Sequence, residues 1–227
     1  MSSHGFSWDK FSKVPVVGII RGLSFDDIRQ ILPVYVASGL TTIEITMNTA
    51  SAMDIIRYAA DNFSGKLNVG AGTVCNEKDL AEALSSGAQF IVTPIISEKV
   101  IKSCVEQQIP IFPGAFTPTE IYRAWELGAS MVKVYPATSL GSDYIKDVKA
   151  PLNHIKLMPT GGINKNNVAE FIRAGSDGLG VGGQLFDKKC IADQDWQALE
   201  SHFKEFVKYF KIEPGTKSQE PRTKNKE

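Results

Sequence analysis

The stretch Val14–Met47, VPVVGIIRGLSFDDIRQILPVYVASGLTTIEITM, contains one complete strand–helix–strand unit. Its two β-branched runs, Val14–Arg21 and Thr42–Met47, predict buried strands. Between them, Phe25–Ser38 has an amphipathic helical pattern that ends at Gly39, a common residue after the last helical turn. A strand, a helix and a second strand in this order predict a parallel pair joined by a right-handed crossover.

The same unit recurs along the rest of the chain. Further short apolar runs predict strands at Asn68–Thr73, Phe90–Thr93, Pro110–Pro113, Met131–Val134, Lys156–Pro159 and Gly178–Val181. Helical patterns fill most of the gaps, at Ser51–Asn62, Glu77–Ser86, Glu98–Gln107, Thr119–Leu127 and Val168–Ala174, with a weaker one at Asp143–Val148. Eight such strands favour a closed (β/α)8 TIM barrel. The alternative is a doubly wound open sheet, but the GxGxxG loop typical of its dinucleotide-binding form does not follow the first strand.

The sequence predicts one folded domain, residues 1–210, and a short tail. An N-terminal extra segment contains Phe6, Trp8 and Phe11, which are expected to cover the bottom of the barrel. A final helix at Trp196–Phe210 closes the domain. Residues 211–227, KIEPGTKSQEPRTKNKE, are polar and are predicted to be a disordered tail.

Composition limits the possible partners. The chain has 227 residues with 25 basic and 25 acidic side chains, so no global positive charge attracts nucleic acid or an anionic membrane. No apolar run approaches the roughly 20 residues of a membrane helix. Three separate cysteines without a CxxC motif indicate neither a disulfide framework nor a zinc site. We expect a cytoplasmic protein with no metal.

A lysine stands within the predicted strand Met131–Val134, although lysine is rarely buried without a partner. Val132 and Val134 share one face of this strand, and valines suit the helix-facing side of a barrel. Lys133 is therefore expected to point toward the barrel axis. It lies near the carboxyl end of its strand, where TIM barrels carry their active sites.

Other polar side chains are expected at the same end. In the stretch TIEITMNT, Thr42–Thr49, alternation with apolar residues turns three polar residues inward, namely Glu44, Thr46 and Asn48. Arg21 and Thr73 end the first and third predicted strands. An amine, a carboxylate, a guanidinium and a hydroxyl are thus predicted to meet at one mouth of the barrel.

These groups suit a Schiff-base aldolase that acts on a 2-oxo acid. Burial and the neighbouring Arg21 are expected to lower the pKa of Lys133 from about 10.4, whereas Glu44 would raise it. A neutral amine can attack a ketone and form an iminium that stabilises an adjacent carbanion, with Glu44 as the general acid and base. Arg21 and Thr73 could bind the substrate carboxylate. The structural alternative is a buried Lys133–Glu44 ion pair, an arrangement that seldom adds net stability.

Two glycine pairs predict a phosphate site. Thr160, Gly161 and Gly162 follow the seventh predicted strand, and Gly182, Gly183 and Gln184 follow the eighth. In TIM barrels the loops at these two positions often bind phosphate through backbone N–H groups. The alternative is that both pairs form simple tight turns.

Several motifs occur in a fixed order: Ile19–Arg21, IEIT at Ile43–Thr46, GAGTV at Gly70–Val74, PGAFTPTE at Pro113–Glu120, VKVYPA at Val132–Ala137, PTGGI at Pro159–Ile163 and VGG at Val181–Gly183. With them the chain resembles the 2-keto-3-deoxy-6-phosphogluconate / 4-hydroxy-2-oxoglutarate aldolase family from about Val14 to Ile191. The resemblance implies that Lys133 forms a Schiff base, that Glu44 moves the proton, and that Arg21 and Thr73 contact the substrate. It further implies that the phosphate site is lined by Gly161, Gly162, Gly182 and Gly183. It also implies a homotrimer without a cofactor. The implied products are pyruvate with glyceraldehyde 3-phosphate, or pyruvate with glyoxylate.

The chain departs from the family pattern at two positions. Asn48 stands where the family usually has an arginine for the pyruvate carboxylate, and Gln184 stands where a serine is common. The related 2-keto-3-deoxy-6-phosphogalactonate aldolases also have asparagine at the first position, so they are the alternative within the family. Two further alternatives are a phosphosugar isomerase or epimerase with Glu44 as base, and a non-catalytic binder of phosphorylated sugar acids.

Overall fold

The computed structural model describes residues 5–210, so the predicted tail 211–227 lies outside the described residues. Short strands alternate with helices along this range. The strands are β1 (Val16–Ile20), β2 (Thr42–Thr46), β3 (Asn68–Gly72), β4 (Phe90–Val92), β5 (Ile111–Phe112), β6 (Gly114–Ala115), β7 (Val132–Val134), β8 (Leu157–Pro159) and β9 (Leu179–Val181). The helices are α1 (Trp8–Lys13), α2 (Phe25–Ser38), α3 (Ala52–Asn62), α4 (Glu77–Ser85), α5 (Glu98–Glu106), α6 (Pro118–Glu126), α7 (Gly141–Lys149), α8 (Val168–Arg173), α9 (Lys188–Ala192) and α10 (Trp196–Val207).

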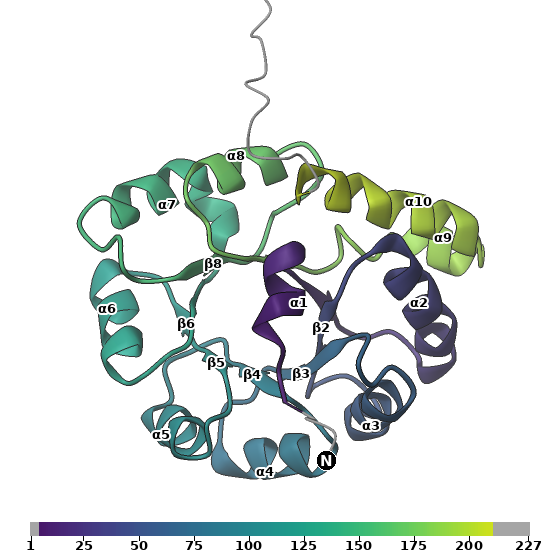
Figure 1. Ribbon diagram of the computed structural model, residues 1–227, viewed down its shortest axis with the longest axis horizontal. Helices are drawn as coiled ribbons and strands as arrows, with labels where there is room; N and C mark the ends of the chain where they lie inside the picture. The colour runs from purple at the N-terminus through teal and green to yellow at the C-terminus, as the bar shows by residue number, and fades with distance from the viewer. Residues whose placement is uncertain (1–4, 211–227) are drawn as a thin grey trace, which may run out of the picture.

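The strands form a curled parallel sheet with helices around it (Figure 1). Six strands are paired in the order β5-β4-β3-β2-β1-β9, and the other three in the order β6-β7-β8. A parallel bridge between Thr160 and Gly180 connects the end of β8 to β9. Within the described residues, no helix is long and apolar enough to cross a membrane.

Pro113 divides the strand that the sequence predicts at Pro110–Pro113. β5 ends before this proline and pairs with β4, whereas β6 begins after it and pairs with β7. Proline has no N–H to donate to a ladder, which accounts for the break between the two short strands. The Pro113 carbonyl still accepts a hydrogen bond from Lys133 N at 2.9 Å.

The helices also differ from the prediction in detail. The weakly patterned segment Asp143–Val148 lies within the longer helix α7, and a 3-10 turn at Ala137–Ser139 precedes it. The sequence pattern did not predict α9, whose five residues are too few to show a helical period. Asp187 caps this helix by accepting hydrogen bonds from Lys189 N and Cys190 N.

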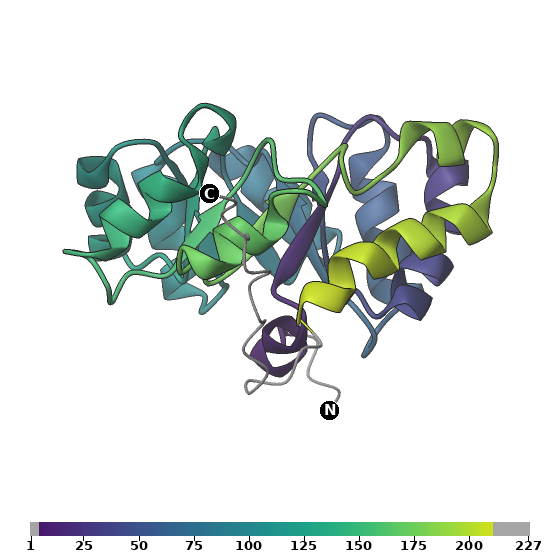
Figure 2. The same ribbon diagram turned by 90° about the horizontal axis from the view of Figure 1, so that it is seen from above.

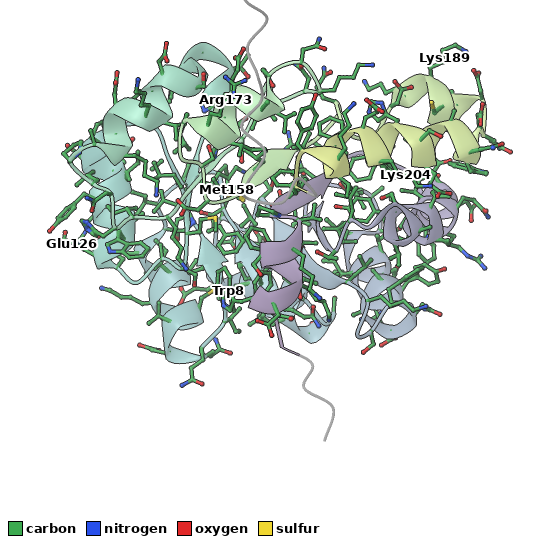
Figure 3. The ribbon with its side chains drawn as sticks, turned by 45° about the horizontal axis from the view of Figure 1, so that its top comes forward. Trp8, Glu126, Met158, Arg173, Lys189 and Lys204 are labelled. Atoms are coloured by element: carbon green, nitrogen blue, oxygen red, sulfur yellow. The ribbon has the colours of Figure 1, made fainter. Side chains whose placement is uncertain are left out.

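Alternation along the strands separates two apolar cores. Val132 and Val134 belong to the larger core, which lies between the sheet and the helices. Met131 and Met158 belong to a smaller core inside the curled sheet, together with Val17, Val92, Phe90, Phe112 and Phe11. Figure 3 shows Met158 near the centre of the molecule. Lys133, two residues beyond Met131, is therefore on the inward face, as the alternation predicts.

The N-terminal segment covers the amino ends of the strands, as the sequence predicts. The Phe6 ring lies 5.2 Å from Phe90 and 6.0 Å from Phe112, centre to centre, and Phe11 lies 6.3 Å from Phe112. Figure 2 shows α1 beneath one end of the sheet. Because apolar side chains and α1 fill this end, the site for chemistry is left at the opposite end.

Candidate active site

A cavity of about 360 Å³ opens at the carboxyl ends of the strands. It lies between β1, β7, β8 and β9 and the loops that follow them. Eight of the residues predicted to form the site line it, namely Arg21, Lys133, Thr160, Gly161, Gly162, Gly182, Gly183 and Gln184. The cavity therefore joins the predicted lysine to both predicted glycine loops.

Lys133 lies at the inner wall of this cavity. Its side chain is 3% exposed, and its Nζ is 5.1 Å from the centre of the Tyr135 ring. Burial lowers the pKa of the Lys133 amine, Glu44 raises it, and Arg21 lowers it further. The net shift is downward, toward the neutral amine that acts as a nucleophile.

Glu44 is not among the residues that line the cavity, but it is close enough to Lys133 to shift the pKa of its amine. It is completely buried, and neither of its carboxylate oxygens has a hydrogen-bond partner among residues 5–210. Burial raises the pKa of the Glu44 carboxyl, and the positive charges of Lys133 and Arg21 lower it by less. A structural ion pair would satisfy these oxygens. Their lack of partners instead leaves them available to a substrate or to water.

Gly72 makes room for the Glu44 carboxylate. A Cβ at this position of β3 would lie 2.8 Å from Glu44 Cδ and closer still to Oε1. The two residues come from neighbouring strands, in which Thr46 pairs with Gly72 and Glu44 with Gly70. Any larger residue at position 72 would displace the carboxylate.

Arg21 lies in the loop after β1, and hydrogen bonds connect this loop to β2. Gly22 N donates to Thr49 Oγ1 at 3.2 Å, and Thr49 Oγ1 lies 2.9 Å from Thr46 Oγ1. Thr46 donates in turn to the carbonyl of Ile20, the last residue of β1. These bonds position the backbone from which the exposed Arg21 side chain enters the cavity.

The glycine loops form the other end of the cavity. Gly161 and Gly162 have φ values of 100° and 74°, a region that side chains rarely adopt. A Cβ at either position would also approach Thr138 Oγ1, at 3.2 Å and 3.0 Å respectively. Thr160, which precedes them, is buried and spans the bridge to Gly180.

Asn48 and Thr73 do not line the cavity. Asn48 is exposed in the turn after β2, so the strand alternation used to predict its direction ends before it. Thr73 directly follows β3 and has a left-handed φ of 59°. Asn48 follows β2, the strand that carries Glu44, and Thr73 follows the neighbouring strand β3.

The sequence did not single out several residues of the cavity wall. Ile19 and Phe186 give it apolar surface, and Thr138 and Lys188 add a hydroxyl and an amine. Ile19 follows directly from alternation in β1, because Val17 is already in the inner core. Thr138 and Lys188 lie in segments without a regular pattern, so only the tertiary structure places them in the site.

A family model for "KDPG and KHG aldolase" matches residues 8–202. The chain belongs to the KDPG and KHG aldolase family. As a member of this family it is a lyase with the chemistry of a Schiff-base aldolase.

Curated members of the KDPG and KHG aldolase family are similar over most of the chain. A 2-dehydro-3-deoxy-phosphogluconate aldolase of Haemophilus influenzae is 33% identical, covering 89% of this chain and 96% of the relative. The 2-dehydro-3-deoxy-6-phosphogalactonate aldolase of Escherichia coli K12 is also 33% identical, covering 77% of this chain and 86% of the relative.

Solved structures of the family have the same fold. One described as native KDPGal superposes with a TM-score of 0.81 at 30% identity, covering 91% of this chain and 97% of that one. The KDPG aldolase of Legionella pneumophila, solved with pyruvate captured as a covalent carbinolamine, has a TM-score of 0.79 at 23% identity. It covers 86% of this chain and 95% of that chain, and at this identity it supports the fold alone.

Proposed function

We propose that this chain cleaves a 2-keto-3-deoxy-6-phospho sugar acid of the phosphogluconate type to pyruvate and glyceraldehyde 3-phosphate, and that it also cleaves 4-hydroxy-2-oxoglutarate to pyruvate and glyoxylate. The observation that carries the proposal is the buried, inward-facing Lys133 amine, whose pKa is lowered, close to the Glu44 carboxyl, which has no hydrogen-bond partner among residues 5–210. Relatives named for phosphogluconate cleavage support this substrate class.

In this proposal Lys133 Nζ attacks the C2 carbonyl of the sugar acid, and loss of water gives an iminium. Glu44 takes the proton of the C4 hydroxyl, the C3–C4 bond breaks, and its electron pair passes into the iminium as an enamine. The aldehyde forms at C4. Glu44 then returns the proton to C3, and water hydrolyses the pyruvate iminium, which regenerates the amine. The raised pKa of Glu44 and the lowered pKa of Lys133 suit this cycle. A protonated Glu44 can give its proton to the departing C2 hydroxyl as the iminium forms, and the resulting carboxylate then takes the C4 hydroxyl proton. Hydrolysis of the pyruvate iminium releases a proton that restores the acid form of Glu44.

The remaining predicted residues bind the two ends of the substrate. Arg21 supplies a cation near Lys133 for the carboxylate, and Asn48 and Thr73 add neutral donors at the rim. At the other end, Thr160, Gly161, Gly162, Gly182, Gly183 and Gln184 surround the phosphate. Backbone N–H groups in glycine loops can approach phosphate oxygens closely because no side chain intervenes.

The phosphogalactonate analogue is the second candidate substrate. It is favoured by Asn48, which can donate hydrogen bonds but gives no charged, bidentate grip on a carboxylate. Similarity to the galactonate aldolase of Escherichia coli, at 33% identity, supports the same candidate. Steady-state assays with the phosphogluconate, phosphogalactonate and hydroxy-oxoglutarate substrates, each coupled to pyruvate detection, distinguish the three by kcat/KM.

We also propose that the two sheets form one closed eight-stranded barrel, with β5 and β6 as a single strand interrupted at Pro113. The Thr160–Gly180 bridge would close the ring on the other side.

A homotrimer is proposed as the assembly. Exposed Ile95, Phe116 and Tyr122 provide apolar surface for it, and a 32% identical chain forms part of a cage made from symmetric oligomeric domains. Light scattering after size-exclusion chromatography tests the assembly. Cytoplasmic location and independence of a cofactor stay predictions.

Borohydride reduction in the presence of pyruvate tests the central step. It should attach a reduced pyruvyl group to Lys133, detected by mass spectrometry of peptides. Lys133→Met should lose the adduct and lower kcat/KM at least about 1,000-fold while the protein still folds. Lys156→Met is the matched control, because Lys156 lies over the Trp8 ring beside α1, at the opposite end of the strands.

The outcomes separate the alternatives. An unlabelled wild-type protein that interconverts phosphosugars would indicate an isomerase or epimerase. Binding, with or without labelling, but no cleavage would indicate a non-catalytic binder. Near-full cleavage by Lys133→Met would rule out the imine.

A further inference from the structure

Lys188 places a third basic side chain at the wall of the cavity. The cavity is lined by Arg21 after β1, Lys133 on β7 and Lys188 at the start of α9. Within the described residues, no aspartate or glutamate lines it. Even with the Lys133 amine neutral, Arg21 and Lys188 leave two cations at a wall that has no carboxylate among the described residues, which suits a ligand with more than one negative group.

The three basic side chains occupy different parts of the site. Arg21 is close enough to Lys133 and Glu44 to shift the pKa of both, whereas Lys188 does not contribute to either shift. Lys188 instead follows the loop of Gly182, Gly183 and Gln184, all of which line the same cavity. Lys188 therefore belongs to the glycine-loop end of the cavity.

The backbone that carries Lys188 is rigidly placed. Phe186, two residues earlier, is buried and stacks on Tyr35 with the ring centres 6.0 Å apart and packs edge-on to Phe203 at 5.8 Å. On the other side, Asp187 accepts hydrogen bonds of 2.9 Å from Lys189 N and Cys190 N. Because these contacts already fix the backbone around Lys188, ligand binding would lose little conformational entropy there.

The amine of Lys188 has no ion-pair or hydrogen-bond partner within residues 5–210. It forms no ion pair there, whereas the adjacent Lys189 pairs with Asp193 within α9 and its C-cap. The neighbouring carboxylate of Asp187 accepts the two backbone N–H groups at the start of α9. A free ammonium beside neutral backbone donors is an arrangement that binds a phosphate dianion.

We propose that Lys188 is a specificity-determining residue that forms a charged contact with the phosphate of the substrate. This inference rests on the proposed function, and it adds a residue to the glycine loops. The neutral backbone amides would orient the phosphate through hydrogen bonds, whereas Lys188 would attract its negative charge. Lys188 would therefore favour phosphorylated over unphosphorylated substrates. Gln184, a neutral residue in the same loop, supplies no such charge.

The test measures two reactions of the intact protein and of Lys188→Met. The first is exchange of the pyruvate methyl protons with solvent, which needs Lys133 and no phosphate. The second is condensation of pyruvate with glyceraldehyde 3-phosphate. Loss of one charge-assisted contact should raise KM for glyceraldehyde 3-phosphate on the order of 10-fold more than it affects the exchange rate. Lys188→Arg should restore most of the loss, and the effect should shrink at high salt.

Lys189→Met is the matched control, since Figure 3 shows Lys189 at the outer edge of the molecule. It should leave both reactions within about twofold of the wild type. Equal effects of Lys188→Met on exchange and on the aldehyde KM, or no effect on either, would overturn the inference. Absence of exchange and of the borohydride adduct in the wild type would instead refute the proposed function.

Discussion

Two glycines on β3 allow the role of the Glu44 carboxylate to be separated from the packing around it. Gly70 and Gly72 are both buried and face the interior of the curled sheet. A Cβ at Gly72 would lie 2.8 Å from Glu44 Cδ, whereas a Cβ at Gly70 would lie 2.6 Å from Phe90 Cδ1. The same Gly→Ala change therefore pushes against a flexible carboxylate at one position and against a rigid aromatic ring at the other.

The two variants should have opposite profiles. Nonbonded carbon atoms normally lie about 3.5 Å apart, so Gly72→Ala must move the carboxyl carbon by roughly 0.7 Å and the nearer oxygen by more. A displacement near 1 Å of a catalytic group can cost on the order of 100-fold in rate. The Glu44 side chain can turn, so the loss of unfolding free energy should stay near or below about 1 kcal/mol. Gly70→Ala should lose about 1–3 kcal/mol from overpacking against Phe90 and retain much more of its turnover.

The assay pairs kcat for substrate cleavage, followed as pyruvate release, with urea unfolding of each variant. Gly5→Ala is the neutral control, because no atom of the described residues lies within 4 Å of a Cβ there. If Gly72→Ala keeps near wild-type kcat, or if both variants lose kcat in proportion to their stability, the position of the Glu44 carboxylate does not limit the reaction.

Two further predictions concern stability. Burial raises the pKa of Glu44 above its ordinary 4.5, so the folded protein keeps a proton that the unfolded chain loses, and the wild type is destabilised as the pH rises through the raised pKa. In urea unfolding, Glu44→Gln should therefore be about 1–3 kcal/mol more stable than the wild type near pH 8 and little different from it near pH 4. Its turnover should fall 100-fold or more. Parallel curves of unfolding free energy against pH for the two proteins would contradict this prediction. Asp177→Asn should lower the free energy of unfolding by about 1–3 kcal/mol, because Asp177 pairs with Lys149 at 2.6 Å and accepts a hydrogen bond from Leu157 N. If the ion pair accounts for this loss, adding Lys149→Met to the Asp177→Asn variant should lower the free energy of unfolding little further.

Much of the site could be predicted because strands impose a simple rule. Met131 and Lys133 lie inward and Val132 and Val134 outward, as alternation requires. The rule ends where the strand ends. Asn48 lies in a turn after its strand. Pro113 separates β5 from β6, where the apolar run in the sequence predicted one continuous strand. Lys188 was missed for a related reason, because it lies at the start of a five-residue helix that has no readable period.

The sequence by itself determined the alternation of strands and helices, apart from α9 and the break at Pro113, together with the inward direction of Lys133 and Glu44 and the family. These properties are local or are carried by ordered motifs, so neighbouring residues are enough to express them. Only the tertiary structure decided that Glu44 has no hydrogen-bond partner within residues 5–210, that Gly72 leaves space for it, and that Lys188 shares a cavity with Lys133. Burial and the pKa shifts that follow from it depend on atoms brought together from distant parts of the chain, and no pattern along the sequence records those distances.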